Sequence, residues 1–322
     1  MPEAQRPLIA GFDAGQTHTT CRLAALEPQG TWRVLSEGEG DGVSHLAAES
    51  GDTRFAAALR SSLMAALAAA ELEARTPLAA AGIGASGIEA GSAVQSQGTA
   101  LAAQCLHLPP THTVVVGDER TALAGAFNGG PGILVISGTG CIAAGSDGQG
   151  QIQRCGGWGW LLDGAGSAMD IGRDGLALSV QMADGRLPDT PLRAALWQAL
   201  GAESAQAVKA AVVSPAFGAA GFARLAPVVD QQAQAGEHHA QAVIARSAEA
   251  LALMVQSVAH QLHLSAPAVC GVGGALLHLQ QLQAAFQVAL QQRLPAASLQ
   301  APEGDACSGA LGLAAQAAIK PH

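Results

Sequence analysis

A set of three short apolar segments, separated by glycine-containing turns, occurs twice in this sequence. The first set covers residues 8–13, 19–26 and 31–36, and the second covers residues 132–137, 141–145 and 151–155. Short apolar segments joined by glycine turns are typical of the strands of a meander. The recurrence therefore predicts a duplicated fold, in which each half of the chain opens with three strands.

Helical and strand-like patterns alternate over the rest of the chain. Helical periodicity occurs in residues 53–74 and 90–106, and further strands are predicted over residues 78–86, 113–118 and 268–272. Between Gly166 and His263 the pattern is mainly helical. The predicted fold class is therefore α/β, with a second half that is larger and more helical than the first.

The length of the chain predicts two domains. A single hydrophobic core usually stops growing before 322 residues, so we expect two cores with a cleft between them. We place the N-terminal domain at residues 1–112 and the larger C-terminal domain at residues 113–304. The apolar helix expected over residues 305–322 needs a surface to cover, so we expect it to pack back on the first domain.

Composition argues against several classes of partner. The net charge is −9 without a basic stripe, and the chain has no Tyr, six Phe and four Trp, so a nucleic-acid partner is not expected. Apolar stretches are interrupted before they reach membrane-spanning length, and the first residues lack the pattern of a secretory signal. The six Cys include no CxxC pair. We therefore expect a soluble, cytoplasmic protein without a membrane partner.

The first strand ends in an acid that is followed by a glycine turn and threonines. Gly15 permits a tight turn, and Thr17 and Thr19 offer hydroxyl and backbone N–H groups to a polyphosphate. Because the carboxylate of Asp13 would repel phosphate, its expected partner is a magnesium ion held through water. The turn is typical of a site for nucleotide phosphates.

Two more glycine turns follow strands, at residues 137–140 and 271–274. With 40 Gly in the chain, any one such turn is more often a turn that simply ends a strand and binds nothing. Three turns at strand ends, together with Asp118, favour a nucleotide site, because glycine lets backbone N–H groups approach phosphates closely.

Asp118 lies between the strand at residues 113–118 and a short helix expected over residues 121–127. A carboxylate in this place can act as a general base. It can equally serve as the N-cap of the helix. The local sequence leaves both interpretations open.

A glycine-tryptophan loop covers residues 155–160, and residues 163–167 follow it. Loops without packing periodicity are where binding groups collect. Trp158 can stack on a sugar ring or fill a core, and the two glycines before it favour ligand approach. For Trp160 packing is at least as strongly expected.

Cysteine and histidine give no metal motif. Cys141 and Cys155 lack the multiple-thiolate spacing of a metal or iron-sulfur site, which favours small core residues. His238, His239, His260 and His263 lie on expected helices and are typical of surface or packing residues, with little support for a metal site. There is also no GxxxxGK[ST] motif.

The order and spacing of these motifs resemble a known family. The ordered set is Asp13-x-Gly-x-Thr-x-Thr, Gly117-Asp118, Ser137-Gly-Thr-Gly140, Cys155-Gly-Gly-Trp-Gly159 and Gly271-x-Gly-Gly274. It resembles the N-acetylglucosamine kinase and BadF/BadG/BcrA/BcrD-type ATPase group of the actin, sugar-kinase and Hsp70 superfamily, over nearly the whole chain. The resemblance implies two ribonuclease-H-like, actin-like domains, each with a β-β-β-α-β-α core, around a central cleft for ATP and sugar.

The resemblance also implies residue roles. Asp118 matches the catalytic base and Asp13 the residue near Mg²⁺. The positions that match ATP-binding residues are Asp13, Gly15, Gln16, Thr17, Gly138, Thr139, Gly140, Gly273 and Gly274. The positions expected to face the sugar are Ser44, His45, Ser86, Asp118, Gly157, Trp158 and Asp163.

The implied activity is transfer of the ATP γ-phosphate to the 6-hydroxyl of N-acetylglucosamine, giving the 6-phosphate and ADP, in a protein expected to be a homodimer. The chain departs from the family at two places. Ser44 stands where relatives often have Asn, and Asp163-Gly-Ala-Gly-Ser167 stands where they commonly read Gly-Asp-Glu-Gly-Ser. The shifted acid keeps glucosamine open as the substrate. An ATPase activator of an iron-sulfur enzyme, with Cys141 and Cys155 as ligands, and a nucleotide-dependent sensor also remain alternatives.

Overall fold

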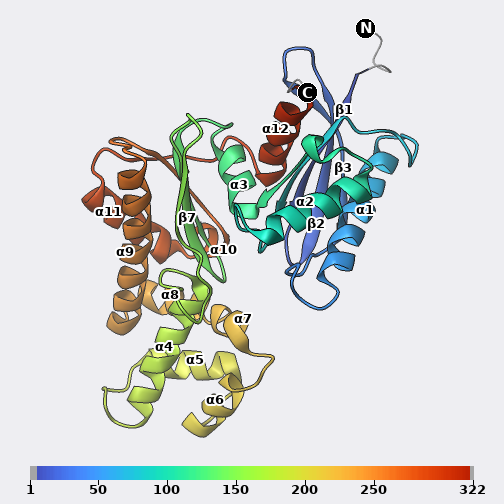
Figure 1. Cartoon of the computed structure of the whole chain (residues 1–322). Coiled ribbons are helices and arrows are strands. Elements are labelled where there is room, and N and C mark those ends of the chain that lie inside the picture. Colours follow the sequence, from blue (N-terminus) through green and yellow to red (C-terminus); the bar gives the residue numbers. More distant parts are fainter. Residues whose placement is uncertain (1–5, 320–322) are drawn as a thin grey trace. The chain divides into compact units, whose positions relative to one another are not determined.

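The computed structural model describes residues 6–319, and it divides into two compact units. The first unit contains the chain up to Gly130 and again from Pro302 onward, and the second contains Pro131–Ala301 (Figure 1). Residues 1–5 and 320–322, which the expected first domain and C-terminal helix include, lie outside the described residues.

A five-stranded mixed sheet forms the centre of the first unit. Its strands are β1 (Leu8–Ala14), β2 (His18–Leu26), β3 (Trp32–Asp41), β4 (Ala80–Ala85) and β5 (Thr113–Gly117). Their order is β3-β2-β1-β4-β5, with β1, β2 and β3 antiparallel and β1, β4 and β5 parallel. The opening meander that the sequence predicts is therefore present.

Helices cover both faces of this sheet. The helices are α1 (Gly51–Ala69), α2 (Ala93–Leu106), α3 (Asp118–Ala126) and α12 (Ala306–Ile319), with a short 3-10 turn at Pro110–His112. Phe12 on β1 packs in the same core as Phe55 of α1, whereas Ile9, three residues earlier and on the opposite face of the strand, packs with Leu311 of α12. Alternation along β1 thus supplies two cores, one for each face.

The first unit extends beyond the boundary expected from the sequence. The sequence predicts that boundary between residues 112 and 113, but β5 pairs in parallel with β4 and completes the first sheet. Val115 and Val116 are buried there, so this strand needs the first unit to cover it.

The segment from Pro302 onward also belongs to this unit, and α12 packs on β1 and β4. A Cβ at Gly82 would lie 2.0 Å from the carbonyl oxygen of Ala310, which shows how closely α12 approaches the sheet.

Helix α1 ends five residues before the expected end at residue 74. Glu71 has a left-handed backbone with φ 56°, and the Leu72 N–H returns to the carbonyl of Leu67 at 2.9 Å. This reversal closes the helix and turns Leu72 back against the core of the unit.

The second unit repeats the topology of the first sheet. Its strands are β6 (Gly132–Ser137), β7 (Cys141–Ser146), β8 (Ile152–Gly156), β9 (Ala268–Val272) and β10 (Ser298–Leu299). The order β10-β9-β6-β7-β8 again has three antiparallel strands followed by parallel neighbours. The duplication predicted from the sequence is confirmed.

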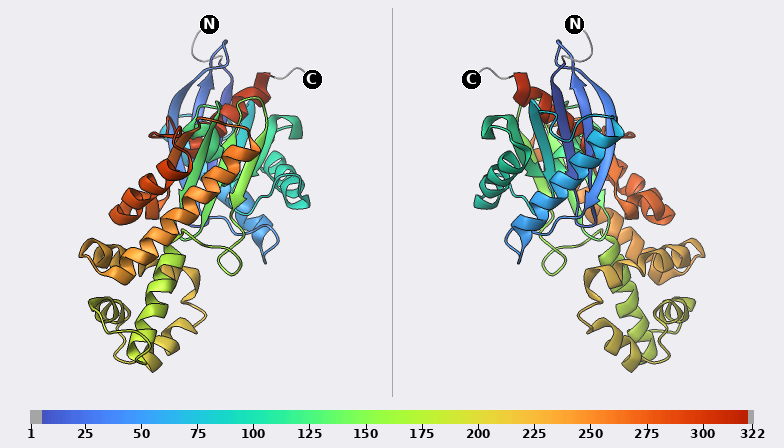
Figure 2. Two further views of the ribbon diagram at one scale, coloured as in Figure 1. Left: turned by 90° about the vertical axis from the view of Figure 1, so that its left-hand side faces the viewer. Right: turned by 90° about the vertical axis from the view of Figure 1, so that its right-hand side faces the viewer.

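Eight helices accompany the second sheet among the described residues. They are α4 (Ala168–Ala183), α5 (Pro191–Leu200), α6 (Ala205–Val212), α7 (Gly218–Ala223), α8 (Ala226–Gln234), α9 (His238–Gln261), α10 (Gly274–His278) and α11 (Gln280–Arg293). Figure 2 shows α9, in orange, lying across the strands of this unit, where it contacts β6, β7 and β8. By length and composition α9 could cross a membrane, but it has the buried inward face of a core helix, with Leu251 and Val255 fully buried.

Candidate functional site

The carboxyl ends of three parallel strands meet at one edge of the first sheet. The register places Ala14 beside Ala85 and Ala85 beside Gly117. The predicted site residues stand at these ends: Asp13 near the end of β1, Ser86 directly after β4 and Asp118 directly after β5. The Ser86 N–H donates to the carbonyl of Ala14 at 3.2 Å, which links the first two strand ends.

Asp118 is the first residue of α3, and Gly117 occupies the N-cap position. The N-cap interpretation of Asp118 is therefore wrong, although its Oδ1 does accept the Glu119 N–H at 2.9 Å. Burial raises the pKa of Asp118, and hydrogen bonds from Glu119 and from the Ser86 side chain lower that pKa in part. A half-buried carboxylate with a raised pKa suits a general base.

Asp13 is a second half-buried carboxylate at this edge. Burial raises its pKa most, the negative charge of Asp118 raises it further, His18 lowers it and Asp305 raises it again. Mutual repulsion between neighbouring carboxylates is relieved by a divalent cation, and carboxylate oxygens are ligands that Mg²⁺ accepts. The residues present at this edge therefore fit the magnesium ion that the family resemblance implies.

Asp305 belongs to this neighbourhood and was missed in the sequence. Its two carboxylate oxygens accept hydrogen bonds of 2.7 and 2.6 Å from the guanidinium of Arg22, and its Oδ1 also accepts the Ser308 N–H at the start of α12. These bonds hold the pKa of Asp305 down to about 2, against the opposing effect of its burial. Asp305 thus keeps a fixed negative charge near Asp13.

The loop that follows β3 reaches the same edge. The Val43 N–H donates to the carbonyl of Gly15 at 2.9 Å, and the His45 ring lies against Gly87, where an added Cβ would meet it at 2.7 Å. The Ser44 hydroxyl is buried and has no hydrogen-bond partner among the described residues. His45 therefore lies against Gly87, the residue that follows Ser86, and Ser44 is its chain neighbour.

The turn after β1 is open to solvent. Gln16 and Thr17 are exposed, and Gln16 Nε2 donates a long hydrogen bond of 3.4 Å to Ser86 Oγ. The structure thus brings all the predicted site residues of the first unit to one sheet edge.

In the second unit, two glycine turns lie against each other. Within the 137–140 loop the Gly138 N–H donates to the Gly140 carbonyl at 2.8 Å, and Ser137 Oγ donates to the Gly166 carbonyl at 2.7 Å. Gly273 has φ 90°, and a Cβ there would lie 2.5 Å from the Ser137 carbonyl oxygen. Glycine at this position therefore allows the 271–274 turn to touch the 137–140 loop.

The residues at the tip of these turns are accessible. Thr139, Gly140 and Gly274 are exposed, and a Cβ at Gly140 would have no atom within 4 Å. A ligand could approach this backbone closely, as phosphate binding by glycine loops requires.

The tryptophan loop projects into solvent after β8. The Gly157 N–H donates to the Cys141 carbonyl at 3.0 Å, while Trp158 is 59% exposed and has the Arg154 guanidinium 5.1 Å from its ring centroid. The packing interpretation of Trp160 is wrong, since this residue is 39% exposed. Both tryptophans are therefore available to a ligand.

Asp163 lies close to the start of β7. Burial raises the pKa of the Cys141 thiol to about 12, and the negative charge of Asp163 acts in the same direction. The Cys141 thiol donates to the Ala165 carbonyl at 3.2 Å, and all six Cys are free. The Cys141 sulfur is therefore buried and engaged in a hydrogen bond within the second unit.

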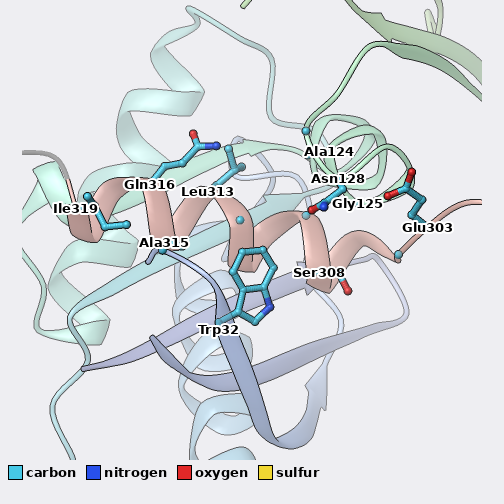
Figure 3. A pocket seen from close by; sticks show the side chains of 15 residues that line it. Trp32, Ala124, Gly125, Asn128, Glu303, Ser308, Leu313, Ala315, Gln316 and Ile319 are labelled. Atoms are coloured by element: carbon cyan, nitrogen blue, oxygen red, sulfur yellow. The ribbon is translucent and has the colours of Figure 1, made fainter. Parts of the chain in front are cut away.

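A cavity of about 400 Å³ in the first unit involves none of the predicted residues (Figure 3). It runs along α12, and its lining includes Trp32, Asn128, Glu303, Ser308 and Gln316. Among the predicted site residues, several at the strand ends and turns are exposed: Gln16, Thr17, Thr139, Gly140 and Gly274.

Two units with the same strand order and glycine turns at their strand ends define an actin-like, ribonuclease-H-like nucleotide-binding fold. The family model of the BadF/BadG/BcrA/BcrD ATPase family matches residues 10–315, and the chain belongs to this family.

Similar proteins carry the names of sugar kinases. An N-acetylmuramic acid/N-acetylglucosamine kinase of Clostridium acetobutylicum is 28% identical over 203 residues, which cover 62% of this chain and 66% of that protein. An N-acetyl-D-glucosamine kinase of Dictyostelium discoideum is 33% identical over 134 residues, 41% of this chain and 42% of that protein. The matches thus span just under two thirds and less than half of these curated relatives.

A solved structure is similar over almost its whole length. The crystal structure of a candidate N-acetylglucosamine kinase of Chromobacterium violaceum has a TM-score of 0.75 and 29% identity, and the match covers 96% of this chain and 99% of that one. This likeness confirms the predicted fold class.

Proposed function

We propose that this protein is a sugar kinase that transfers the γ-phosphate of ATP to the 6-hydroxyl of N-acetylglucosamine. The observation that carries the proposal is the position of Asp118, a half-buried carboxylate with a raised pKa beside Ser86 and Asp13. Family membership and the names of the similar proteins support the same reaction class.

In the proposed reaction Asp118 accepts the proton of the sugar 6-hydroxyl. The hydroxyl oxygen forms a bond to the γ-phosphorus, the bond from that phosphorus to the bridging β–γ oxygen breaks, and ADP leaves with the electron pair. Ser86 holds the Asp118 carboxylate by a hydrogen bond. When bound near Asp13, Mg²⁺ supplies positive charge to the phosphate oxygens.

We assign nucleotide contacts to the remaining glycine turns. In the first unit these are Gly15, Gln16 and Thr17, and in the second unit they are the 137–140 loop with Gly273 and Gly274. Backbone N–H groups in such turns stabilise charge on a transferring phosphoryl group.

The sugar contacts are assigned to Ser44, His45, Ser86, Gly157, Trp158 and Asp163. Trp158 offers an exposed ring for stacking, and the unpaired Ser44 hydroxyl can bond to a sugar oxygen. Asp163 favours a second candidate, glucosamine, because a carboxylate can pair with a free amine. The iron-sulfur activator is disfavoured because the Cys141 thiol is buried and already donates to the Ala165 carbonyl.

The proposal is tested by measuring ADP release with N-acetylglucosamine, glucosamine and plain hexoses at equal concentration. We expect the highest kcat/KM for N-acetylglucosamine, with the phosphate on the 6-oxygen by ³¹P–¹H NMR. A higher kcat/KM for glucosamine would establish the second candidate. ATP binding without sugar-stimulated ADP release would overturn the kinase and leave the nucleotide-dependent sensor.

The Gly140→Ala variant tests close approach of the nucleotide. The added methyl has no protein atom within 4 Å and φ is not in the left-handed region, so the melting temperature should stay within about 1 °C of the wild type. If phosphate contacts this backbone, the Kd for ATP should rise about tenfold or more. Isothermal titration and thermal unfolding of the same preparation separate the two effects, and an unchanged Kd would remove Gly140 from the site.

The pH dependence should reflect the raised pKa of Asp118 in two opposite ways. As a base it must be deprotonated, so kcat/KM, which reports the free enzyme, should fall on acidification with a midpoint above the value near 4 of an exposed aspartate. In stability the sign reverses: because the folded state holds the proton more tightly, the free energy of unfolding decreases as pH rises through this pKa.

The matched measurement for this pH dependence uses Asp118→Asn. The variant should melt a few degrees higher than the wild type at pH 7, and this difference should shrink at acid pH. Equal melting temperatures at pH 7 would contradict the raised pKa.

A further inference from the structure

The start of α9 brings three potential metal ligands together. Glu237, His238 and His239 are consecutive, and their ligand atoms all lie within 4.8 Å of one another. The sequence favoured surface or packing roles for these histidines and gave little support for a metal site. This cluster lies within the second unit and includes none of the residues assigned to the kinase reaction.

Glu237 is buried with one oxygen unused. The residue is 9% exposed, and its Oε2 accepts the Ala240 N–H at 2.6 Å as the cap of α9. Its Oε1 is buried without a hydrogen-bond partner among the described residues, and His238 Nδ1 stands 3.5 Å from it. Burial of a carboxylate oxygen without a hydrogen bond is costly, and the His238 ring at ion-pair distance neutralises it only when protonated, so a bound cation would satisfy this atom.

His239 supplies a second, independent observation. Its Nε2 is also buried without a partner in the described part of the chain. The rings of His238 and His239 are 3.9 Å apart between centroids with an angle of 38° between their planes, so the two imidazoles stand together beside the carboxylate. Buried imidazole nitrogens are rarely left unpaired, and a metal ion is a partner that both imidazoles and the carboxylate can share.

We propose that Glu237, His238 and His239 bind one zinc ion. Two imidazole nitrogens and one carboxylate oxygen suit a borderline-soft metal, whereas Mg²⁺ and Ca²⁺ prefer oxygen ligands alone. Tetrahedral bonds of about 2.1 Å place ligand atoms about 3.4 Å apart, close to the 3.5 Å between Glu237 Oε1 and His238 Nδ1. The 70% exposed side chain of His238 is free to rotate and shorten the longer separations.

The surroundings allow a cation. The partial positive charge at the N-terminus of α9 opposes it, but this effect is weak compared with three direct ligand bonds and the full negative charge of Glu237. A fourth position stays open to water, as in three-ligand zinc sites.

The proposed ion would fix the first turn of a central helix. Helix α9 packs on three strands of its sheet, and two turns further along it Arg246 pairs with Asp170, which lies 1% exposed in α4. The expected role is therefore to stabilise the second unit. This role involves no residue of the proposed kinase reaction.

The test is a zinc titration of untagged, nucleotide-free protein against a chromophoric competing chelator. The wild type should bind one equivalent, and zinc at about a hundredfold excess over Kd should raise the Tm by about 5 °C. Co²⁺ in place of zinc should give visible d–d absorption. His238→Ala should weaken zinc binding at least tenfold without changing the metal-free Tm, because the side chain is exposed.

Two further variants complete the experiment. Glu237→Gln keeps a carbonyl oxygen to cap α9 but loses the anionic ligand, so it should also weaken zinc binding at least tenfold. The double variant His260→Ala/His263→Ala removes two exposed histidines near the other end of α9 and should bind zinc like the wild type. The proposal is overturned if the wild type shows no saturable zinc binding, or if His238→Ala and Glu237→Gln keep wild-type affinity.

Discussion

Asp118→Asn is expected to lower kcat by about 10²–10⁴-fold, the usual contribution of a general base, while the Kd for ATP stays within about twofold of the wild type. The amide has nearly the same size and can still accept the Glu119 N–H through its oxygen, so α3 should begin in the same place. It cannot take a proton from the sugar hydroxyl. Steady-state ADP release and isothermal titration with ATP measure the two quantities.

A matched control separates the chemistry from a general loss of charge. Asp52→Asn removes an exposed acid from the first turn of α1 in the same unit, and it should leave kcat unchanged. Unaltered turnover in Asp118→Asn would eliminate Asp118 as the base, whatever the sugar proves to be. A fall in kcat accompanied by a lower Tm would indicate misfolding, whereas removal of the buried charge should raise the Tm.

The strands and the strand-end residues could be predicted because each rests on local pattern. Alternation and glycine turns define both meanders, and parallel pairing then brings Asp13, Ser86 and Asp118 to one edge without further information. The helix after Gly117 was also predicted, but its first turn was not. Asp118 already has helical geometry, so the N-cap falls on a glycine that offers no side chain.

The features that sequence reasoning missed depend on pairs distant in the chain or on burial. Arg22 and Asp305 meet only because α12 returns to the first sheet, and no local pattern marks either residue. The predicted domain boundary at residue 112 was wrong for a related reason. A strand followed by an acid can be the last strand of one sheet or the first of the next, and β5 pairs with β4 of the first unit. Glu237 and His239 look like ordinary surface residues until the unpaired atoms are seen to be buried.

Glycine positions show how much of the candidate site is backbone rather than side chain. Many of the chain's glycines serve packing, as at Gly82 under α12, and only the contacts distinguish them from glycines that a ligand could approach. In the second unit Gly273 packs against Ser137, whereas its chain neighbour Gly274 has free space that a ligand could occupy. This difference can be measured.

Gly273→Ala is expected to disrupt the 137–140 loop. Gly273 has φ 90° and ψ 152°, a region that other residues almost never adopt, and its Cβ would lie 2.5 Å from the Ser137 carbonyl oxygen and 2.7 Å from the carbonyl carbon. Backbone atoms cannot move aside as a flexible side chain can. We expect a loss of about 2–4 kcal/mol of stability, a Tm lower by about 4–16 °C, and at least a tenfold rise in the Kd for ATP.

Gly274→Ala is the neighbouring control, because its Cβ would meet a side-chain atom, His278 Cδ2, only at 3.9 Å and its φ is not left-handed. Its Tm should match the wild type within about 1 °C. If the adenosine part of ATP approaches this backbone, the Kd for ATP should still rise, since the methyl group then meets the ligand and not the protein. Equal melting temperatures for the two alanine variants would refute the packing of Gly273 on Ser137, and an unchanged Kd in Gly274→Ala would remove Gly274 from the nucleotide site.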